Sequence, residues 1–486
     1  MNGSDFILAI DLGTTCAKMA CGRAGDVEII PNQEGQIQTP CAVWLNPQGR
    51  LVAGQRAKSA LITDSANVQL NFVRDLGSSV EYEFPRASVR VKPQELTAEF
   101  LKSLRADAER FTEREIRRVV ITVAPAAGLA QCAATKQAAL DAGFVDCVLI
   151  QDAVAAALAA NVTDDAGHKT VLIYDFGGGR FSASVLRVHN KLFQVVAHAG
   201  DSFLGGTNLD RAVVESFFIP ALQAAHSKLE FSACNPRTRE AYARLQAEAE
   251  AGKLRLSQAD EVDIFVPRLC EDESRLPIEF QCKLKRAELE RLAGPLVERT
   301  ISICERVLAD AHIATSEVNK LIPTGGMALM PFVRQRLQER FGQEMISVGS
   351  SVDPTTAAVR GAAIFAASQH LQNAIHPVEN QTDEPQSRSE HSPPSASASF
   401  PDDDWEMIIA AQQPDSPARS AALETLVSTY YPFVIRCLLV EKRSREEAED
   451  LAQGFLCAFW KATPSAKFAK IKEVSDISSG KFFGAM

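Results

Sequence analysis

The sequence predicts an α/β protein of two related lobes, followed by a polar linker and a small α-helical module. An apolar run that ends in Asp and then in Gly or Thr occurs twice, at residues 6–15 and 171–179. From residue 6 to about 370, strand-like and helix-like stretches alternate without a long polar break. Three strands followed by strand-helix alternation appear twice in that part, which implies two related lobes.

The pattern of apolar and turn residues then gives each element its place. Short apolar runs bounded by turn residues predict strands at 6–11, 16–21, 119–124, 171–175, 181–188 and 192–198. Apolar residues at helical spacing predict helices at 94–110, 130–141, 152–161, 208–225, 236–256, 285–311, 331–340 and 355–368. Residues 1–370 are accordingly predicted as one domain.

The two Asp-Gly turns are the candidate chemical centre. Glycines let backbone N–H groups approach phosphate oxygens, and each Asp can hold a divalent cation beside them, directly or through water. Asp is also a common cap of helices and turns, and a single turn of this kind occurs in many folds. Two in one chain predict a phosphate site. Its residues are Asp11, Gly13, Thr14 and Thr15 in the first turn, and Asp175, Gly177, Gly178 and Gly179 in the second.

Composition excludes several classes of function. The chain has 486 residues with 46% hydrophobic and 23% charged residues, which is typical of soluble globular proteins. A formal net charge of −10 argues against a general polyanion binder, and no DNA binding is expected. Eleven Cys lie scattered without a CxxC pair, which favours reduced thiols in the core. With neither a secretory signal nor a membrane helix at the start of the sequence, a cytoplasmic location is expected.

The C-terminal part has a different character. Residues 371–403 are rich in Gln, Asn, Ser, Pro and acidic residues, a composition that predicts a disordered linker. Residues 404–486 again carry apolar residues at helical spacing, and Ser444 to Glu447 form a capping box. A helical hairpin of two main helices is expected there.

Further motifs appear in a fixed order along the first domain. They are 119–125, 134–143, 149–158, 200–210, 250–257, 324–326, 353–354 and 361–363. In this order and spacing they resemble the nucleotide-binding domain of the 70-kilodalton heat-shock chaperones, the DnaK type, over about 6–370.

That resemblance implies an actin-like ATPase fold, with two lobes around a cleft that holds ATP or ADP and Mg²⁺. Asp11 and Asp175 would position the magnesium ion and the attacking water, and Asp152 matches a catalytic carboxylate. The matching phosphate residues are Gly13, Thr14, Thr15, Gly177, Gly178 and Gly179. The matching adenosine residues are Glu250, Lys253 and Ser257 on a helix, with Gly205, Gly206, Gly325 and Gly326 where the backbone approaches the nucleoside.

Taken singly, these residues have ordinary structural explanations. A Gly pair is most often a turn, and Glu250 or Lys253 alone would be a solvated helix face. The joint pattern is what favours the nucleotide site.

Departures from the family pattern predict a slow ATPase. Val73 stands at the place of a catalytic Lys, and Arg180 and Ser182 replace a Thr and an Asp. Asp152 stands where the family has a Glu, so the carboxylate is carried by a shorter side chain. Residues 327–329 lack the Arg that stacks on adenine in the family. Removing one preorganised electrostatic group costs roughly 10²–10³ in rate. Arg74 or Arg180 is a candidate for the missing cation, and the alternative for Arg180 is that it points to solvent.

Residues 404–486 resemble a truncated region 2 of an extracytoplasmic-function sigma factor. The resemblance rests on stretches such as 404–405, 430–432, 446–455 and 480–482. It implies contact with RNA polymerase, and the alternative is a vestigial or purely interaction-making module.

The sequence therefore leaves two main hypotheses for the function and a third alternative. The first is a chaperone-like ATP-binding module with a protein client or co-chaperone, without the family's peptide-binding β-sandwich because residues from 369 onward are polar. The second is a transcription-linked adaptor that uses 404–486. An actin-like filament or a sugar kinase shares the two Asp turns but does not account for 200–210.

Overall fold

The computed structural model describes residues 6–23, 26–162, 169–189, 192–226, 231–232, 235, 238–271, 275–343 and 352–375. All of them belong to a unit that spans Met1–Asn380. The second unit, Gln381–Met486, lies outside the described residues, and so does the predicted helical module. Everything below concerns the first unit.

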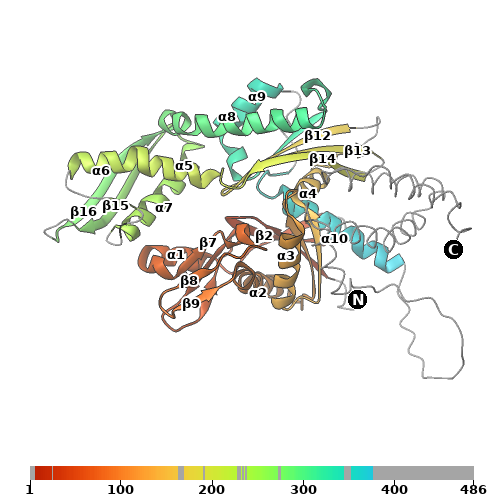
Figure 1. Ribbon diagram of the computed structural model, residues 1–486, viewed down its shortest axis with the longest axis horizontal. Helices are drawn as coiled ribbons and strands as arrows, with labels where there is room; N and C mark the ends of the chain where they lie inside the picture. The colour runs from red at the N-terminus through yellow and green to blue at the C-terminus, as the bar shows by residue number, and fades with distance from the viewer. Residues whose placement is uncertain are drawn as a thin grey trace, which may run out of the picture. The chain divides into compact units, whose positions relative to one another are not determined.

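The first lobe is built on a mixed sheet of order β11-β10-β1-β2-β3. Its strand β2 is labelled in Figure 1. β1 is parallel to β10 and β10 to β11, whereas β2 runs antiparallel to both β1 and β3. β1 is a central strand, and its first four residues are buried because both of its faces are covered. The strands are β1 (Ile7–Leu12), β2 (Cys16–Arg23), β3 (Asp26–Ile30), β10 (Arg118–Val123) and β11 (Asp146–Gln151).

Smaller elements complete this lobe on one side of the sheet. β4 (Thr39–Pro40) pairs with β2, β5 (Ala42–Leu45) lies between β6 (Leu51–Ala53) and β7 (Val68–Leu70), and β8 (Tyr82–Phe84) pairs with β9 (Val89–Val91). The helical segments are α1 (Gln55–Asp64), η1 (Ser65–Asn67), η2 (Phe72–Asp75), α2 (Pro93–Thr112) and α3 (Leu129–Asp141). Their apolar faces close one core, which includes Leu8, Ile10, Phe72 and Phe100.

The second lobe repeats the central plan. Its sheet has the order β14-β13-β12-β17, with β12 parallel to β17 and antiparallel to β13. β12 and β13 thus correspond to β1 and β2, and β17 corresponds to β10. The strands are β12 (Lys169–Phe176), β13 (Phe181–His189), β14 (Leu192–Asp201) and β17 (Lys320–Thr324).

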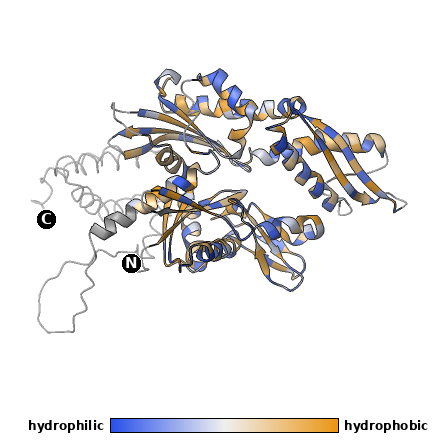
Figure 2. Ribbon diagram, turned by 180° about the vertical axis from the view of Figure 1, so that it is seen from behind, coloured by the Kyte–Doolittle hydropathy of each residue, from blue (hydrophilic) through white to orange (hydrophobic). Residues whose placement is uncertain are grey.

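Helices and a hairpin extend the second lobe. The segments are α5 (Gly206–Val213), the π-helical η3 (Val214–Phe218), α6 (Ile219–Ala225), α7 (Arg239–Leu256), α8 (Arg286–Asp310), η4 (Thr315–Glu317), η5 (Gly326–Leu329) and α9 (Pro331–Phe341). β15 (Glu261–Glu271) and β16 (Pro277–Lys285) form an antiparallel hairpin. Hydrophobic and hydrophilic residues alternate along both strands (Figure 2), because one face packs against α7 and the other is exposed.

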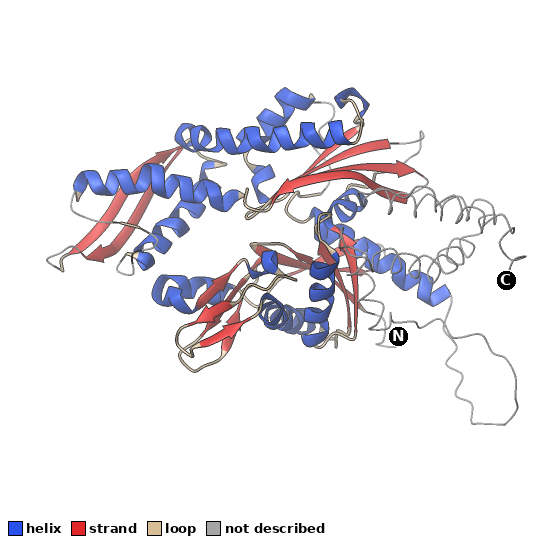
Figure 3. Ribbon diagram, in the orientation of Figure 1, coloured by secondary structure: helices blue, strands red, loops and turns tan. Residues whose placement is uncertain are grey.

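Two helices, α4 (Asp152–Ala159) and α10 (Ala357–Ile375), pack against each other beside the two central sheets (Figure 3). Ala155 of α4 is buried with strands of the first lobe, whereas Ala156 and Ala157 are buried with β12, β13 and β17. Gly361 of α10 is required at the helix crossing, because a Cβ there would lie 1.6 Å from the carbonyl oxygen of Ala155.

Every strand and helix expected within the described residues is present, with ends shifted by a few residues. The helix expected at 355–368 continues to Ile375, past the predicted start of the linker. The elements not anticipated are mainly β5–β9, α1, β11, β15, β16 and β17. Within the described residues, no helix is both long and apolar enough to cross a lipid bilayer.

Candidate functional site

The two Asp turns face each other between the lobes. A cavity of about 180 Å³ lies beside them and is lined from both sides. Thr14, Val73 and Thr122 come from the first lobe, and Arg180 and Ser182 come from the second. The duplicated motif therefore forms a single site rather than two.

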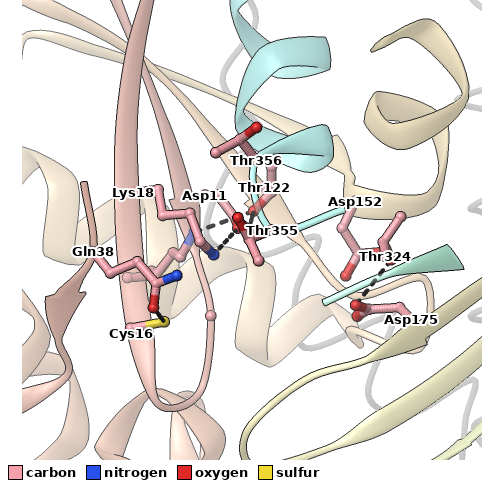
Figure 4. Close-up of polar contacts among 12 residues, drawn as sticks. Asp11, Cys16, Lys18, Gln38, Thr122, Asp152, Asp175, Thr324, Thr355 and Thr356 are labelled. Carbon is pink, nitrogen blue, oxygen red and sulfur yellow. Dashed lines mark hydrogen bonds and ion pairs between the residues drawn. The ribbon is translucent and has the colours of Figure 1, made fainter. Parts of the chain in front are cut away.

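Asp11 is the penultimate residue of β1, and each of its two carboxylate oxygens contacts a neighbouring side chain (Figure 4). Thr122 on β10 donates its hydroxyl to Asp11 Oδ1 at 2.9 Å, and the ammonium of Lys18 lies 3.2 Å from Oδ2. Lys18 faces Asp11 directly across the β1–β2 pair. Burial disfavours the Lys18 ammonium, but the acidic groups of Cys16, Asp11 and Asp175 outweigh it and raise its pKa.

Asp175 holds the equivalent place near the end of β12. Thr324 on β17 donates to Asp175 Oδ1 at 3.0 Å, and Arg180 lies 3.8 Å from Oδ2. Across the β12–β13 pair, Asp175 faces Ser182, the residue that replaces the family's second Asp. A hydroxyl therefore lies where the resemblance expects a carboxylate.

The glycine-rich turns meet the first lobe at close range. An added Cβ on Gly178 would lie 2.5 Å from Thr15 Oγ1, and one on Gly179 would lie 2.9 Å from Thr14 Cγ2. Gly13 is restricted too, since its Cβ would lie 2.7 Å from the Cys16 carbonyl oxygen. Only glycine lets the two turns approach in this way.

The turn of the second lobe also joins the start of α5. The carbonyl of Gly177 accepts the Gly206 N–H at 3.0 Å, and the carbonyl of Gly178 accepts the Thr207 N–H at 2.8 Å. A Cβ on Gly205 would lie 2.4 Å from the Gly178 carbonyl oxygen. The predicted residues Gly177, Gly178, Gly205 and Gly206 are therefore contiguous in space.

Arg180 points inward rather than to solvent. Its guanidinium pairs with Asp152 at the start of α4 as well as lying near Asp175. Asp152 is buried, and burial together with the charges of Asp175 and Asp11 raises its pKa to about 7, although Arg180 opposes the rise. The alternative in which Arg180 points to solvent is therefore wrong, while its role as the replacement for the missing cation stays a prediction.

Arg74 takes up a second position between the lobes. Its Nη2 donates to the Gly179 carbonyl at 3.0 Å, and its guanidinium lies 4.6 Å from the centre of the Phe203 ring. Val73, the residue before it, is buried in the first-lobe core and offers no donor. The Arg74 side chain therefore binds the glycine-rich turn of the second lobe through the backbone carbonyl of Gly179.

The helix α7 brings the predicted adenosine residues to the same region. The Lys253 ammonium lies 3.2 Å from the Gly206 carbonyl oxygen and 2.7 Å from Asp210 Oδ1, so it is not a solvated helix face. Ser257 Oγ lies 3.5 Å from the Lys253 carbonyl oxygen, one turn along. Glu250 forms a 2.7 Å ion pair with Lys58 of α1, which joins the two lobes.

The pair Gly325-Gly326 closes this side. Gly325 has φ of +83° and its Cβ would lie 2.4 Å from the Phe176 carbonyl oxygen, so the turn demands glycine. Its N–H donates to the Pro354 carbonyl at 3.1 Å, which links two of the predicted motifs. A Cβ on Gly326, by contrast, would meet nothing within 4 Å, so open space lies beside this residue. Leu329, at the place of the adenine-stacking Arg, is partly exposed.

Direct ligation of the expected divalent cation would compete with the present partners of the two carboxylates. Asp11 is contacted by Thr122 and Lys18, and Asp175 by Thr324 and Arg180, with one partner on each carboxylate oxygen. Cations lying beside both carboxylates oppose a third positive charge. Among the described residues, no group of three or more His, Cys, Asp or Glu side chains could hold a metal ion.

The residues that the sequence reasoning did not select are Lys18, Lys58, Thr122 and Thr324. Lys18 could have been found, because a lysine in the apolar strand 16–21 needs a partner, and a hairpin after Asp11 places the two opposite. The two threonines depend on which strands lie side by side, which the sequence alone does not give.

Two duplicated α/β lobes with facing strand-Asp turns define a two-lobed domain of the actin-like ATPase fold. The family model described as Hsp70 protein matches residues 7–378, and this chain belongs to the Hsp70 family. The match ends before residues 404–486, and the comparisons give no support to the sigma-factor resemblance, which stays a prediction outside the described residues.

Individual relatives agree with this assignment. The Chaperone protein DnaK of Thermotoga neapolitana is 33% identical over 364 residues, covering 75% of this chain and 59% of the relative. That of Thermosipho africanus is 33% identical over 367 residues, with the same two coverages. That of Nitrosopumilus maritimus is 30% identical over 364 residues, covering 74% and 56%. The matched part of this chain thus spans little more than half the length of these relatives.

Proposed function

We propose that residues 6–375 form an ATP- or ADP-binding module of the Hsp70 type. The observation that supports it most strongly is the contact of the two glycine-threonine turns, in which Thr14 and Thr15 lie against Gly178 and Gly179. Beside them, Lys253 is held against Gly206, at the edge expected for the nucleoside. The residues predicted to bind phosphate and adenosine therefore lie near one another, which supports the proposal.

Turnover in this site is proposed to be slow. Val73 has no donor, Ser182 has no carboxylate, and Arg180 is committed to Asp152 and Asp175. Losses within one catalytic unit are not additive, so a single combined rate factor is not justified. The module is better suited to holding a nucleotide than to splitting it, and we propose that nucleotide state gates a protein client or co-chaperone.

Isothermal calorimetry with ATP and ADP on the full chain tests nucleotide binding. Gly326→Val is the informative variant, because a Cβ at this position meets nothing within 4 Å and the added side chain would obstruct a nucleoside bound there. We expect it to weaken binding by about tenfold or more while its melting temperature stays unchanged. Gly294→Ala in α8, where a Cβ also meets nothing within 4 Å, is the matched control and should bind normally.

No heat of binding at millimolar ATP would refute the proposal. Wild-type affinity in the Gly326→Val variant would contradict this placement of the nucleoside. The RNA polymerase adaptor depends entirely on residues 404–486, and no observation on the described residues favours it.

A further inference from the structure

The site carries its own positive charges where a metal ion is expected. Lys18 stands on β2 between Ala17 and Met19, both of which are buried. Its side chain is only 10% exposed, and its ammonium is directed at the Asp11 carboxylate rather than outward. An ammonium has three donors, so the contact with Asp11 leaves two for another anion.

Arg180 supplies the second charge from the other lobe. It directly follows Gly179 and pairs with Asp152, while its Nη2 lies 3.8 Å from Asp175 Oδ2. The guanidinium has five donors, which exceeds what these two carboxylates use. Arg180 lines the cavity next to Thr14 and Ser182, so part of it faces the space between the lobes.

The charge balance of the site follows from these pairs. With all three carboxylates ionised, Asp11, Asp152 and Asp175 stand against the two cations Lys18 and Arg180, which leaves one negative charge; protonation of Asp152, whose pKa is raised to about 7, leaves the five groups neutral. A cluster of unpaired carboxylates beside phosphate needs a divalent cation to offset the repulsion. In this protein, Lys18 on β2 and Arg180 on the turn before β13 already supply two positive charges, as many as one divalent cation would.

We propose, on the basis of the nucleotide site above, that Lys18 and Arg180 take the place of the divalent cation and that the cleft binds nucleoside di- or triphosphate without metal. Arg180 lines the cavity beside Thr14, and Lys18 lies at Asp11, the residue before Leu12, which also lines it, so the phosphate chain is placed near these two groups. Asp11 and Asp175 then serve to hold the two cations in place rather than to bind a metal ion.

The test is calorimetry of ADP and ATP binding to the full chain, in excess magnesium and in EDTA. Wild-type affinity is expected to differ by less than about threefold between the two conditions. Lys18→Met keeps the length of the side chain and removes its charge, so affinity in EDTA should fall by about tenfold or more, as for one lost charge-assisted hydrogen bond. Magnesium should restore part of that loss, because Asp11 is then free.

Three outcomes would overturn the inference. Binding in magnesium that is lost in EDTA refutes it and leaves the proposed nucleotide binding intact. Wild-type affinity of Lys18→Met in EDTA also refutes it. Absence of binding in both conditions refutes this inference and the proposed function together.

A second variant covers the case in which Lys18→Met does not fold. The double change Lys18→Met with Asp11→Asn removes both charges and leaves no buried carboxylate unpaired. It is expected to bind weakly in EDTA and to gain nothing from magnesium, since the carboxylate is gone. A gain from magnesium equal to that of Lys18→Met would show that Asp11 is not the group released, and would contradict the proposal.

Discussion

Lys18 and Ser182 hold equivalent positions in the two lobes, each seven residues after the Asp that it faces across a strand pair. Lys18 faces Asp11 between β1 and β2, and Ser182 faces Asp175 between β12 and β13. The duplication therefore keeps the backbone of both turns while the facing side chains differ. One lobe contributes a buried cation and the other a hydroxyl.

Removal of Lys18 alone should destabilise the protein. Lys18→Ala leaves the Asp11 carboxylate without its ion partner in a site that is largely shielded from water. Breaking a buried pair in this way costs about 3–5 kcal/mol of unfolding free energy. Urea unfolding measures this loss of unfolding free energy. The double variant Lys18→Met with Asp11→Asn should recover a large part of it, because no carboxylate is left unpaired. An unchanged midpoint for Lys18→Ala would show that the pair is exposed in solution.

Restoring the family's side chains should raise ATP turnover. Val73→Lys adds a donor, while Arg180→Thr with Ser182→Asp returns the hydroxyl and carboxylate to the second turn. Each preorganised group is worth roughly 10²–10³ in rate, although not additively. Phosphate release in magnesium is the measurement, and the same triple variant with Asp175→Asn is the control. A rate equal to that of the wild type would mean that the scaffold does not support hydrolysis.

The ion pair Lys58–Glu250 should slow nucleotide release slightly. It joins α1 and α7 across the lobes at 2.7 Å, but both side chains are over one third exposed. Exposed pairs contribute at most about 1 kcal/mol, so Lys58→Gln should speed release by no more than about fivefold. Stopped-flow release of a fluorescent ADP analogue tests this, and high salt should abolish the difference. Arg336→Gln, which breaks a surface pair with Glu298 within the second lobe, should have no effect.

Gly361 should be intolerant of any side chain. A Cβ there would lie 1.6 Å from the Ala155 carbonyl oxygen, so Gly361→Ala must separate α10 from α4. Overpacking typically costs about 1–3 kcal/mol, and a clash with backbone falls at the upper end or beyond. Gly294→Ala in α8 is the matched control, and it should be neutral or stabilising by up to about 1 kcal/mol. Equal melting temperatures for the two variants would contradict this packing.

Asp152 should make stability depend on pH. Burial and the charges of Asp175 and Asp11 raise its pKa to about 7, from an ordinary value near 3.8. The folded protein therefore binds this proton more tightly than the unfolded chain. The stability that proton binding contributes is present below about pH 4 and is lost as the pH rises to about 7. Asn does not titrate, so Asp152→Asn does not lose stability in this way as the pH rises. The melting temperature of the variant minus that of the wild type should therefore be larger at pH 8 than at pH 5, as measured by differential scanning fluorimetry. A constant difference would indicate that Asp152 stays ionised throughout.

The sequence was sufficient for the elements that carry strong local signals. The strands ending at Asp11 and Asp175 are continuous apolar runs, and the long helices have clear apolar periodicity, so both could be predicted. β15 and β16 carry an alternating pattern that also could have been recognised, with Val262, Ile264 and Val266 buried on one side. Short strands such as β6 and β7 have too few residues for any periodicity to emerge.

The site was predictable as a set of residues but not as a set of contacts. Gly178 and Thr15 are far apart in the chain, and their approach depends on how the lobes meet. The inward direction of Arg180 depends on Asp152, whose helix lies beside the turn. Such contacts depend on tertiary packing, which the local patterns of a single sequence do not predict.

The alanine-rich helices α4 and α10 have a mechanical consequence. Ala155 and Gly361 bring the two backbones into contact, while Ala156 and Ala157 face the second lobe. The short side chains at this point let the two backbones touch, while Leu158 and Phe365 of the same helices pack against the first-lobe sheet. Lys58 and Glu250 join the lobes at a second place, so the lobes are connected both at the helix crossing and through an exposed ion pair. A larger side chain at Ala156 would therefore press on the contact between α4 and the second-lobe sheet, and we expect it to alter nucleotide exchange from a position remote from the glycine-rich turns.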